Sequence, residues 1–276
     1  MAVFRIEKTR DYTVMSNYHL RDMSLSLKAK GLLSLMLSLP ENWDYESTAA
    51  RAALVNTHAH AAAKAYGAIA LNWPVGGLNP YAVHNALERG AKIIFMPTRD
   101  AANSLESGDM PGDFFSRPGI TIMDESGRLK PEVYEIMDAV KAHGAALATG
   151  HIYARESVLL CREGCARGVK MVLTHPKFSH TKIDGATQKE LADLGALIEK
   201  CWYNVAENEA TAAEMAAHIK EVGAARCFMT TDRGQQGRET PVEGMKRFIA
   251  AMLENGLSED EVYIMTHTVP EQVLSE

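Results

Sequence analysis

The feature that most constrains the fold is a repeated alternation of short β-rich runs with amphipathic helical stretches from residue 51 onward. Such a repeat favours a parallel sheet, because parallel strands need a long crossover between them. The runs that predict strands are 68–72, 92–97, 145–151, 169–176, 196–203 and 226–232. The stretches that predict helices are 80–89, 131–143, 155–167, 188–194, 211–222 and 241–255.

Glycines punctuate this repeat between a helix and the next strand, where a left-handed C-cap favours them. They are Gly90, Gly144, Gly168, Gly195 and Gly223. The sequence therefore predicts an α/β fold, a (β/α)8 TIM-like barrel that is incomplete because it has about six βα units instead of eight. Its two open sheet edges predict self-association, so that we expect a homo-oligomer.

The composition of the sequence changes between Asp44 and Ala53, where a Leu/Met/Ser-rich segment is followed by an Ala-rich one. We therefore expect a short N-terminal helical segment at 1–45 and the barrel domain at 51–276. Within the first segment, Ser24 or Ser26 can cap a helix that Pro40 ends.

Composition excludes several classes of protein. The chain has 276 residues, of which 46% are hydrophobic and 23% charged, as in ordinary globular domains. Its net charge of -6 argues against a nucleic-acid partner, and four cysteines are too few for a disulfide scaffold of this length. No window has the run of roughly 18 apolar residues that a membrane span needs, and the start lacks a secretory signal. We expect a cytoplasmic protein with no membrane partner.

The candidate catalytic residues lie where predicted strands end, because in such barrels those ends surround a shared mouth. They are His151 in ATGH, His175 in VLTHP and Asp232 in TTDRGQ. Imidazole and carboxylate groups are ligands of a catalytic divalent metal, with zinc expected first and manganese or iron as alternatives. Asp232 would also act as general base. Alternatively, a histidine at a strand end simply hydrogen-bonds a neighbouring loop.

Other polar residues near the strand ends are predicted to bind substrate: Asn72, Asn79, Thr98, Arg99, Glu199, Arg233 and Gln235. Glu199 could instead form a structural ion pair with Arg99, Arg233 or Lys177. Backbone amides of the glycine-rich run LNWPVGGLNP could face an anionic group, or the run could merely connect a strand to a helix. His58 and His60 mimic an HxH metal pair, but their surroundings favour a helix, on which residues two apart do not share a face.

The runs LNWPVGGLNP, KIIFMPTRDAAN, ATGHI, VLTHP and TTDRGQ resemble a family of amidohydrolase-like proteins of unknown function within the metal-dependent hydrolases. The resemblance extends from Arg51 to the end and implies a TIM-like barrel in which His151, His175 and Asp232 match the later metal-site positions. It also implies a first strand with a D-x-H-x-H-like motif and then a second strand, and the sequence contains neither. Residues 1–45 resemble the opening of a helix-turn-helix domain of phage-type and Gram-positive replication proteins, without its recognition helix.

Three hypotheses follow. The first is a metal-dependent hydrolase that cleaves a C–N, C–O or phosphate-ester bond of a small-molecule substrate. The second is a catalytically inactive barrel remnant, or a binding module, that lacks the first-strand metal ligands. The third, a transcription or replication factor, depends only on the first segment, and the acidic charge argues against it.

Overall fold

The computed structural model describes residues 7–8, 13–14, 52–53, 55–57, 64–108, 117–235 and 237–275. The chain divides into two compact units, Met1–Ser47 and Thr48–Glu276. In the first unit the described residues are two antiparallel strands, β1 (Glu7–Lys8) and β2 (Thr13–Val14). The helix expected before Pro40 and the HxH pair of His58 and His60 lie outside the described residues.

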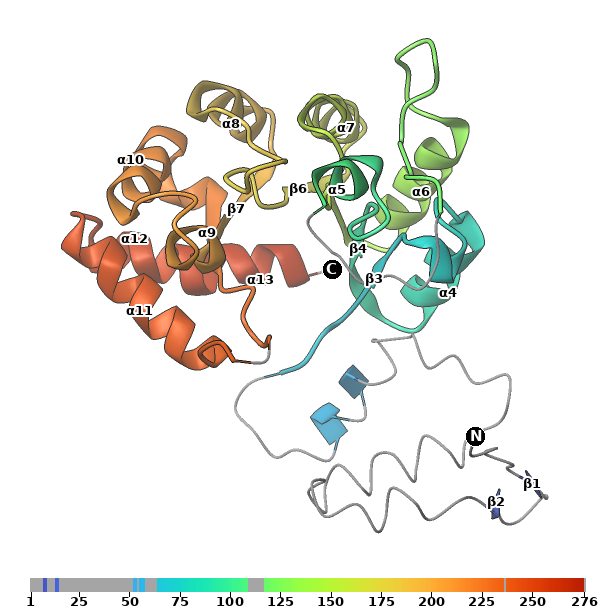
Figure 1. Cartoon of the computed structure of the whole chain (residues 1–276), viewed down its shortest axis with the longest axis horizontal. Helices are drawn as coiled ribbons and strands as arrows, with labels where there is room; N and C mark the ends of the chain where they lie inside the picture. The colour runs from blue at the N-terminus through green and yellow to red at the C-terminus, as the bar shows by residue number, and fades with distance from the viewer. Residues whose placement is uncertain are drawn as a thin grey trace. The chain divides into compact units, whose positions relative to one another are not determined.

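The second unit contains the expected parallel sheet, in which six strands pair in chain order (Figure 1). They are β3 (Gly67–Ala70), β4 (Ala91–Phe95), β5 (Ala146–Ala148), β6 (Lys170–Leu173), β7 (Leu197–Cys201) and β8 (Cys227–Thr230). Among the described residues, β3 pairs only with β4 and β8 pairs only with β7, so the barrel is not closed. The prediction of an α/β barrel with about six units is confirmed. Self-association through the two edges stays a prediction.

Helices connect the strands, and several of them cover the outer face of the sheet (Figure 1). They are η1 (Trp73–Val75), α4 (Pro80–Glu88), α5 (Ala102–Ser107), α6 (Pro131–Ala142), α7 (Ala154–Ala166), α8 (Gly185–Asp193), α9 (Trp202–Ala206), α10 (Ala212–Val222), η2 (Ala224–Arg226), α11 (Pro241–Glu254), α12 (Glu259–Tyr263), η3 (Ile264–Thr268) and α13 (Val269–Leu274). Helices α4, α6, α7 and α8 pack on β4, β5, β6 and β7 respectively. Gly90 and Gly168 adopt the expected left-handed backbone, with φ of 87° and 75°.

The C-terminal helix α13 packs on the opposite face of the sheet, which in a closed barrel would be the lumen. Side chains of a strand alternate between faces, so Leu147 enters the main core whereas Ala146 and Ala148 face inward. These small side chains leave room for Val269 and Val273 of α13, which are 0% and 3% exposed. Helix α13 therefore covers the inner face of the sheet, which the six described strands do not close into a barrel.

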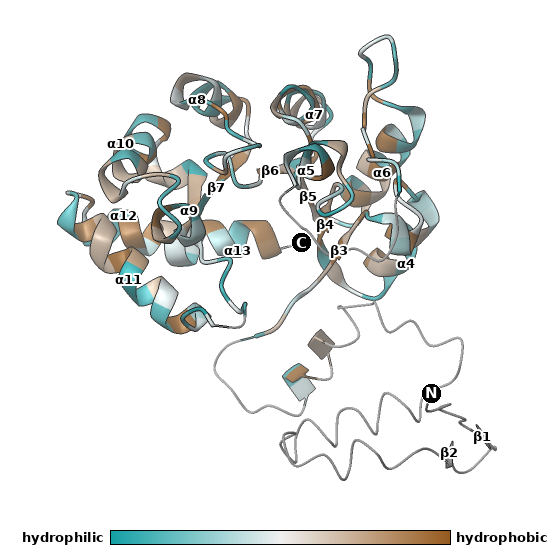
Figure 2. Cartoon of the chain, viewed as in Figure 1, coloured by the Kyte–Doolittle hydropathy of each residue, from teal (hydrophilic) through white to brown (hydrophobic). Residues whose placement is uncertain are grey.

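The helices carry one apolar face each, as their packing requires. In Figure 2, α11 shows hydrophobic and hydrophilic positions side by side, and its buried Phe248 and Met252 are four residues apart. Cys161, Cys201 and Cys227 are buried, Cys165 is half-buried, and all four are free thiols. Within the described residues, no helix is both long and apolar enough to cross a membrane.

Candidate functional site

The carboxyl ends of β5, β6 and β8 bring three of the predicted residues together. The ring centres of His151 and His175 are 5.6 Å apart. On the other side of His175, its Nε2 lies 4.0 Å from Oδ2 of Asp232. The parallel sheet places these ends at one edge, where β5 and β6 are adjacent and β7 lies between β6 and β8.

His151 is positioned by a close approach of two loops. Gly150 precedes it with φ of 61°, and a Cβ at that position would lie 2.4 Å from the backbone oxygen of Met96. Only glycine fits there, and the N–H of His151 then donates to the oxygen of Pro97 at 2.9 Å. The sequence ATGH thus encodes a turn that brings the histidine over the end of β4.

The imidazole of His151 is buried, and its Nδ1 has no hydrogen-bond partner among the described residues. Burial, together with the neighbouring His175 and His180, lowers the pKa of His151 to about 3. The ring is therefore neutral at physiological pH, which is the protonation state that a metal ligand requires. A buried nitrogen without a partner is uncommon and needs an explanation.

His175 is oriented by Glu199 of the neighbouring strand β7. Its Nδ1 lies 3.1 Å from Oε2 of Glu199, within ion-pair range but without the angle of a hydrogen bond. The same oxygen accepts the backbone N–H of His175 at 3.1 Å, and Oε1 accepts the hydroxyl of Thr230 at 2.8 Å. A carboxylate beside one imidazole nitrogen leaves the other to face a metal or a substrate. Glu199 therefore orients His175, and its predicted contact with substrate stays a prediction.

Asp232 is the exposed member of the group, with 48% of its side chain accessible. His175 and Asp232 both have left-handed backbone, with φ of 44° and 47°, and Asn208 is the only other non-glycine residue among those described that does so. Such backbone costs about 1 to 3 kcal/mol and is concentrated at functional sites. The side chain of Gln235 donates to the backbone oxygen of Asp232 at 2.8 Å and so supports this conformation.

Arg233, predicted to contact substrate, is held by two carboxylates instead. Its Nη1 lies 2.9 Å from Glu207 and its Nε lies 3.1 Å from Glu239. Glu239 also accepts the indole N–H of Trp202 at 2.8 Å. These bonds fix the loop after β8. A contact between Arg233 and substrate stays a prediction, and a substrate group would have to compete with both carboxylates for the guanidinium.

Asn72 and Thr98 bind each other at the ends of β3 and β4. The amide of Asn72 donates to the hydroxyl of Thr98 at 2.9 Å, and its Oδ1 accepts the backbone N–H groups of Thr98 and Asp100, both at 3.0 Å. Asp100, which sequence reasoning did not single out, is buried, accepts the N–H of Trp73 at 2.6 Å and pairs with Arg117. These bonds hold the carboxyl ends of β3 and β4 together, so this side of the mouth is structurally fixed.

Asn79 caps α4, because its Oδ1 accepts the N–H of Tyr81 at 3.1 Å. The backbone N–H groups of Gly76, Gly77 and Asn79 donate to backbone oxygens within the same turn. The structure thus favours the connecting turn over the anion-binding loop. Of the other predicted contacts, Arg99 is exposed, and its binding to substrate stays a prediction.

Sequence reasoning missed His180, which lies beside His151 with a ring-centre distance of 5.7 Å. The only signal was its place in HPKFSH, five residues after His175, which follows β6. It also missed Phe178, whose ring centre is 5.7 Å from that of His151 and 6.1 Å from that of His175. The positions of His180 and Phe178 depend on the conformation of the loop after β6.

The donor types fit a divalent metal: neutral imidazoles, a carboxylate that orients one of them and an exposed carboxylate beside it. In the described part of the chain, however, no three His, Cys, Asp or Glu side chains already converge on one metal position. Metal binding at this mouth would therefore require side-chain rotation.

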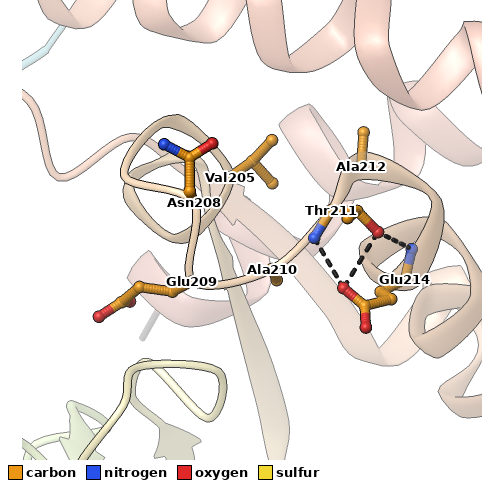
Figure 3. Close-up of a pocket in the computed structure, with 7 residues that line it drawn as sticks. All are labelled: Val205, Asn208, Glu209, Ala210, Thr211, Ala212 and Glu214. Carbon is orange, nitrogen blue, oxygen red and sulfur yellow. Dashed lines mark hydrogen bonds between the residues drawn. The ribbon is translucent and has the colours of Figure 1, made fainter.

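A hollow of about 340 Å³ lies beside the loop from α9 to α10 (Figure 3). Its lining has no imidazole. Glu214 at its edge accepts the N–H and hydroxyl of Thr211, and Glu209 accepts the amide of Asn204 at 2.7 Å. These carboxylates already bind the loop and the cap of α10. The hollow is therefore a weaker candidate for a catalytic site than the group of His151, His175 and Asp232.

The sheet and its helices define the chain as an α/β fold of the TIM-barrel type, of which six parallel strands are described. An amidohydrolase from Pseudomonas aeruginosa is similar in structure, with a TM-score of 0.50, 14% identity, and coverage of 72% of this chain and 69% of that one. YjjV, a TatD homologue from Escherichia coli K12, has a TM-score of 0.50, 13% identity and coverage of 81% of both chains. At such identities the likeness concerns the fold.

The chain belongs to the family of unknown function DUF6282, whose model matches residues 41–199. No curated protein sequence matches it. The family model covers His151 and His175, ends at Glu199 within β7 and does not reach Asp232. None of these findings supports the helix-turn-helix resemblance of residues 1–45.

Proposed function

We propose that this protein is a metal-dependent hydrolase of a small-molecule substrate, with its site at the mouth formed by β5, β6 and β8. The observation that carries the proposal is the position of His175 between two carboxylates, Glu199 at 3.1 Å and Asp232 at 4.0 Å. His151 adds a buried, neutral imidazole at the same place.

In this proposal His151, His175 and Asp232 would hold a divalent cation, zinc first. A cation held there would lower the pKa of a water molecule to about 7 and so supply a nucleophile at neutral pH. Glu199 keeps Nε2 of His175 directed at the mouth. Asp232 is exposed enough to reach substrate, so it accepts a proton as the bond to substrate forms and returns it to the leaving group.

The bond cleaved would be a C–N, C–O or phosphate-ester bond, since all three have a leaving group that needs a proton. The test is hydrolysis of small amides, esters and phosphate esters by the full chain supplied with zinc, manganese or iron. Asp232→Asn should lose any turnover while it still folds. Asp193→Asn, an exposed carboxylate on α8, is the matched control and should keep it.

The alternative is a binding module on an open barrel, and the unpaired edges of β3 and β8 within the described sheet favour it. It predicts metal binding without turnover on any of the three substrate classes. Turnover that depends on Asp232 would exclude this alternative.

A further inference from the structure

Arg233, the residue after Asp232, is firmly anchored although it follows an exposed residue. Its side chain is 1% exposed, whereas that of Asp232 is 48% exposed. Nη1 of Arg233 donates to Oε1 of Glu207 at 2.9 Å, and Nε donates to Oε1 of Glu239 at 3.1 Å. A guanidinium is planar and its donors have fixed directions, so two carboxylates fix its position as well as its charge.

Helix α9 supplies most of this anchor. Glu207 is the C-cap residue of α9, and the indole N–H of Trp202 donates to the same oxygen of Glu239 that Arg233 binds, at 2.8 Å. Cζ of Arg233 also lies 5.5 Å from the ring centre of Tyr203, within the range of a cation–π contact. The loop after β8 is therefore tied to the helix after β7.

Gly244 brings α11 against the alkyl stem of Arg233. A Cβ at this position would lie 3.1 Å from Cγ of Arg233 and 3.2 Å from Cδ1 of Trp202. Glycine is a poorer helix former than alanine, so its place inside α11 needs a compensating contact. The close approach of the helix to these two side chains is that contact.

The anchor leaves Asp232 little freedom. Only Thr231 and Asp232 lie between the end of β8 at Thr230 and the anchored Arg233. The chain turns within this span, and Asp232 takes a φ of 47°. Left-handed backbone at a residue other than glycine persists only where the surrounding structure imposes it. Here the strand imposes it from one side and Arg233 from the other.

We infer that Arg233 is a positioning residue for Asp232, the proton acceptor of the proposed reaction, and that Gly244 allows α11 to hold it in place. The inference rests on the proposed function. The turn that Arg233 maintains places Oδ2 of Asp232 4.0 Å from Nε2 of His175. A general base must lie within hydrogen-bond reach of the proton it takes, so release of this turn would misplace the carboxylate.

The test uses the full chain without added metal and measures the backbone of Asp232 by NMR. A strong nuclear Overhauser effect between the amide and α protons of one residue is diagnostic of positive φ, and wild-type Asp232 should show it. Arg233→Lys should weaken this signal, because an ammonium group lacks the planar fork that binds two carboxylates. Arg162→Lys, which changes an exposed arginine paired with Glu190, is the matched control and should keep it.

Gly244→Ala separates positioning from a loss of stability. Alanine is the better helix former, but its Cβ would press on Cγ of Arg233, which the two carboxylates keep from moving aside. The Asp232 signal should therefore weaken in this variant too. Thermal melting checks that both variants are folded.

Turnover is the second measurement. On an amide, ester or phosphate ester that the wild type hydrolyses, Arg233→Lys and Gly244→Ala should lower kcat by roughly tenfold to a hundredfold with little change in KM, since a misplaced base affects the chemical step more than binding. An unchanged Asp232 signal in both variants, or an unchanged kcat despite a lost signal, would overturn the inference and leave the hydrolase proposal intact. A signal lost in both variants, without turnover by the wild type, would support the anchoring of Asp232 by Arg233 and overturn the hydrolase proposal.

Discussion

His175 and Asp232 face each other across 4.0 Å, although β7 separates the strands that carry them, and both hold left-handed backbone. Two neighbouring strained residues are maintained only where the surrounding structure fixes them. Here Glu199 fixes the first from β7 and Gln235 supports the second from the next turn. This pair is the centre of the proposed site.

Glu199→Gln should weaken metal binding by about 10- to 100-fold, because the neutral amide no longer favours the orientation of His175 that directs Nε2 at the mouth. The measurement is zinc affinity by chelator competition. Glu190→Gln, which removes an exposed carboxylate paired with Arg162, should leave the affinity unchanged. Equal affinities for both variants would show that Glu199 has no part in the site.

Gly150→Ala should destabilise the protein by well over the roughly 1 kcal/mol that left-handed backbone costs an alanine, because the new Cβ also meets the oxygen of Met96. Gly195→Ala is the control, since φ is 114° there but nothing lies within 4 Å of the added Cβ. Urea unfolding measures both free energies. If Gly150→Ala is no less stable than Gly195→Ala, the close approach that positions His151 is not present in solution.

Lys200 should make stability depend on alkaline pH. Burial lowers its pKa to about 8, while the unfolded chain keeps a value near 10.5. Between those values the unfolded chain binds more protons, so this group adds stability as pH rises, by up to about 3 kcal/mol. Below pH 8 both states are protonated and the gain is absent.

The measurement compares the unfolding free energies of the wild type and Lys200→Met from pH 7 to 10.5, because buried thiols such as Cys227 titrate in the opposite sense. The unfolding free energy of the wild type should increase relative to that of Lys200→Met as pH rises. Exposed Lys246→Met is the control and should run parallel to the wild type. A constant difference for Lys200→Met would contradict the buried position of this amine beside Gln188.

Val273→Asp should lower the unfolding free energy by about 3 kcal/mol, because it places a carboxylate against the inner face of the sheet. Val242→Asp on α11, where the valine is 64% exposed, is the matched control and should change little. Light scattering should also show more association for the first variant, since release of α13 would uncover apolar strands. Two equally stable variants would mean that α13 does not fill this face.

The sheet was predictable because a glycine lies between each helix and the next of the five strands β4 to β8, and because polar residues follow the strands, as Gly168 before β6 and His175 after it illustrate. The inner-face packing of α13 was not, since Val269 and Val273 on so short a helix do not indicate which surface they cover. His151 and Asp232 followed from their places at strand ends. The orienting role of Glu199 and the position of His180 depend on strand register and loop closure, which no local pattern encodes.

The most direct measurement is metal content by elemental analysis of protein purified without chelator, for the wild type and His151→Ala/His175→Ala. His84→Ala/His267→Ala removes two exposed histidines and is the control. The account predicts about one equivalent of zinc, manganese or iron in the wild type and the control, and its loss in the first double variant. Absence of metal from all three proteins, or equal metal in all three, would contradict it.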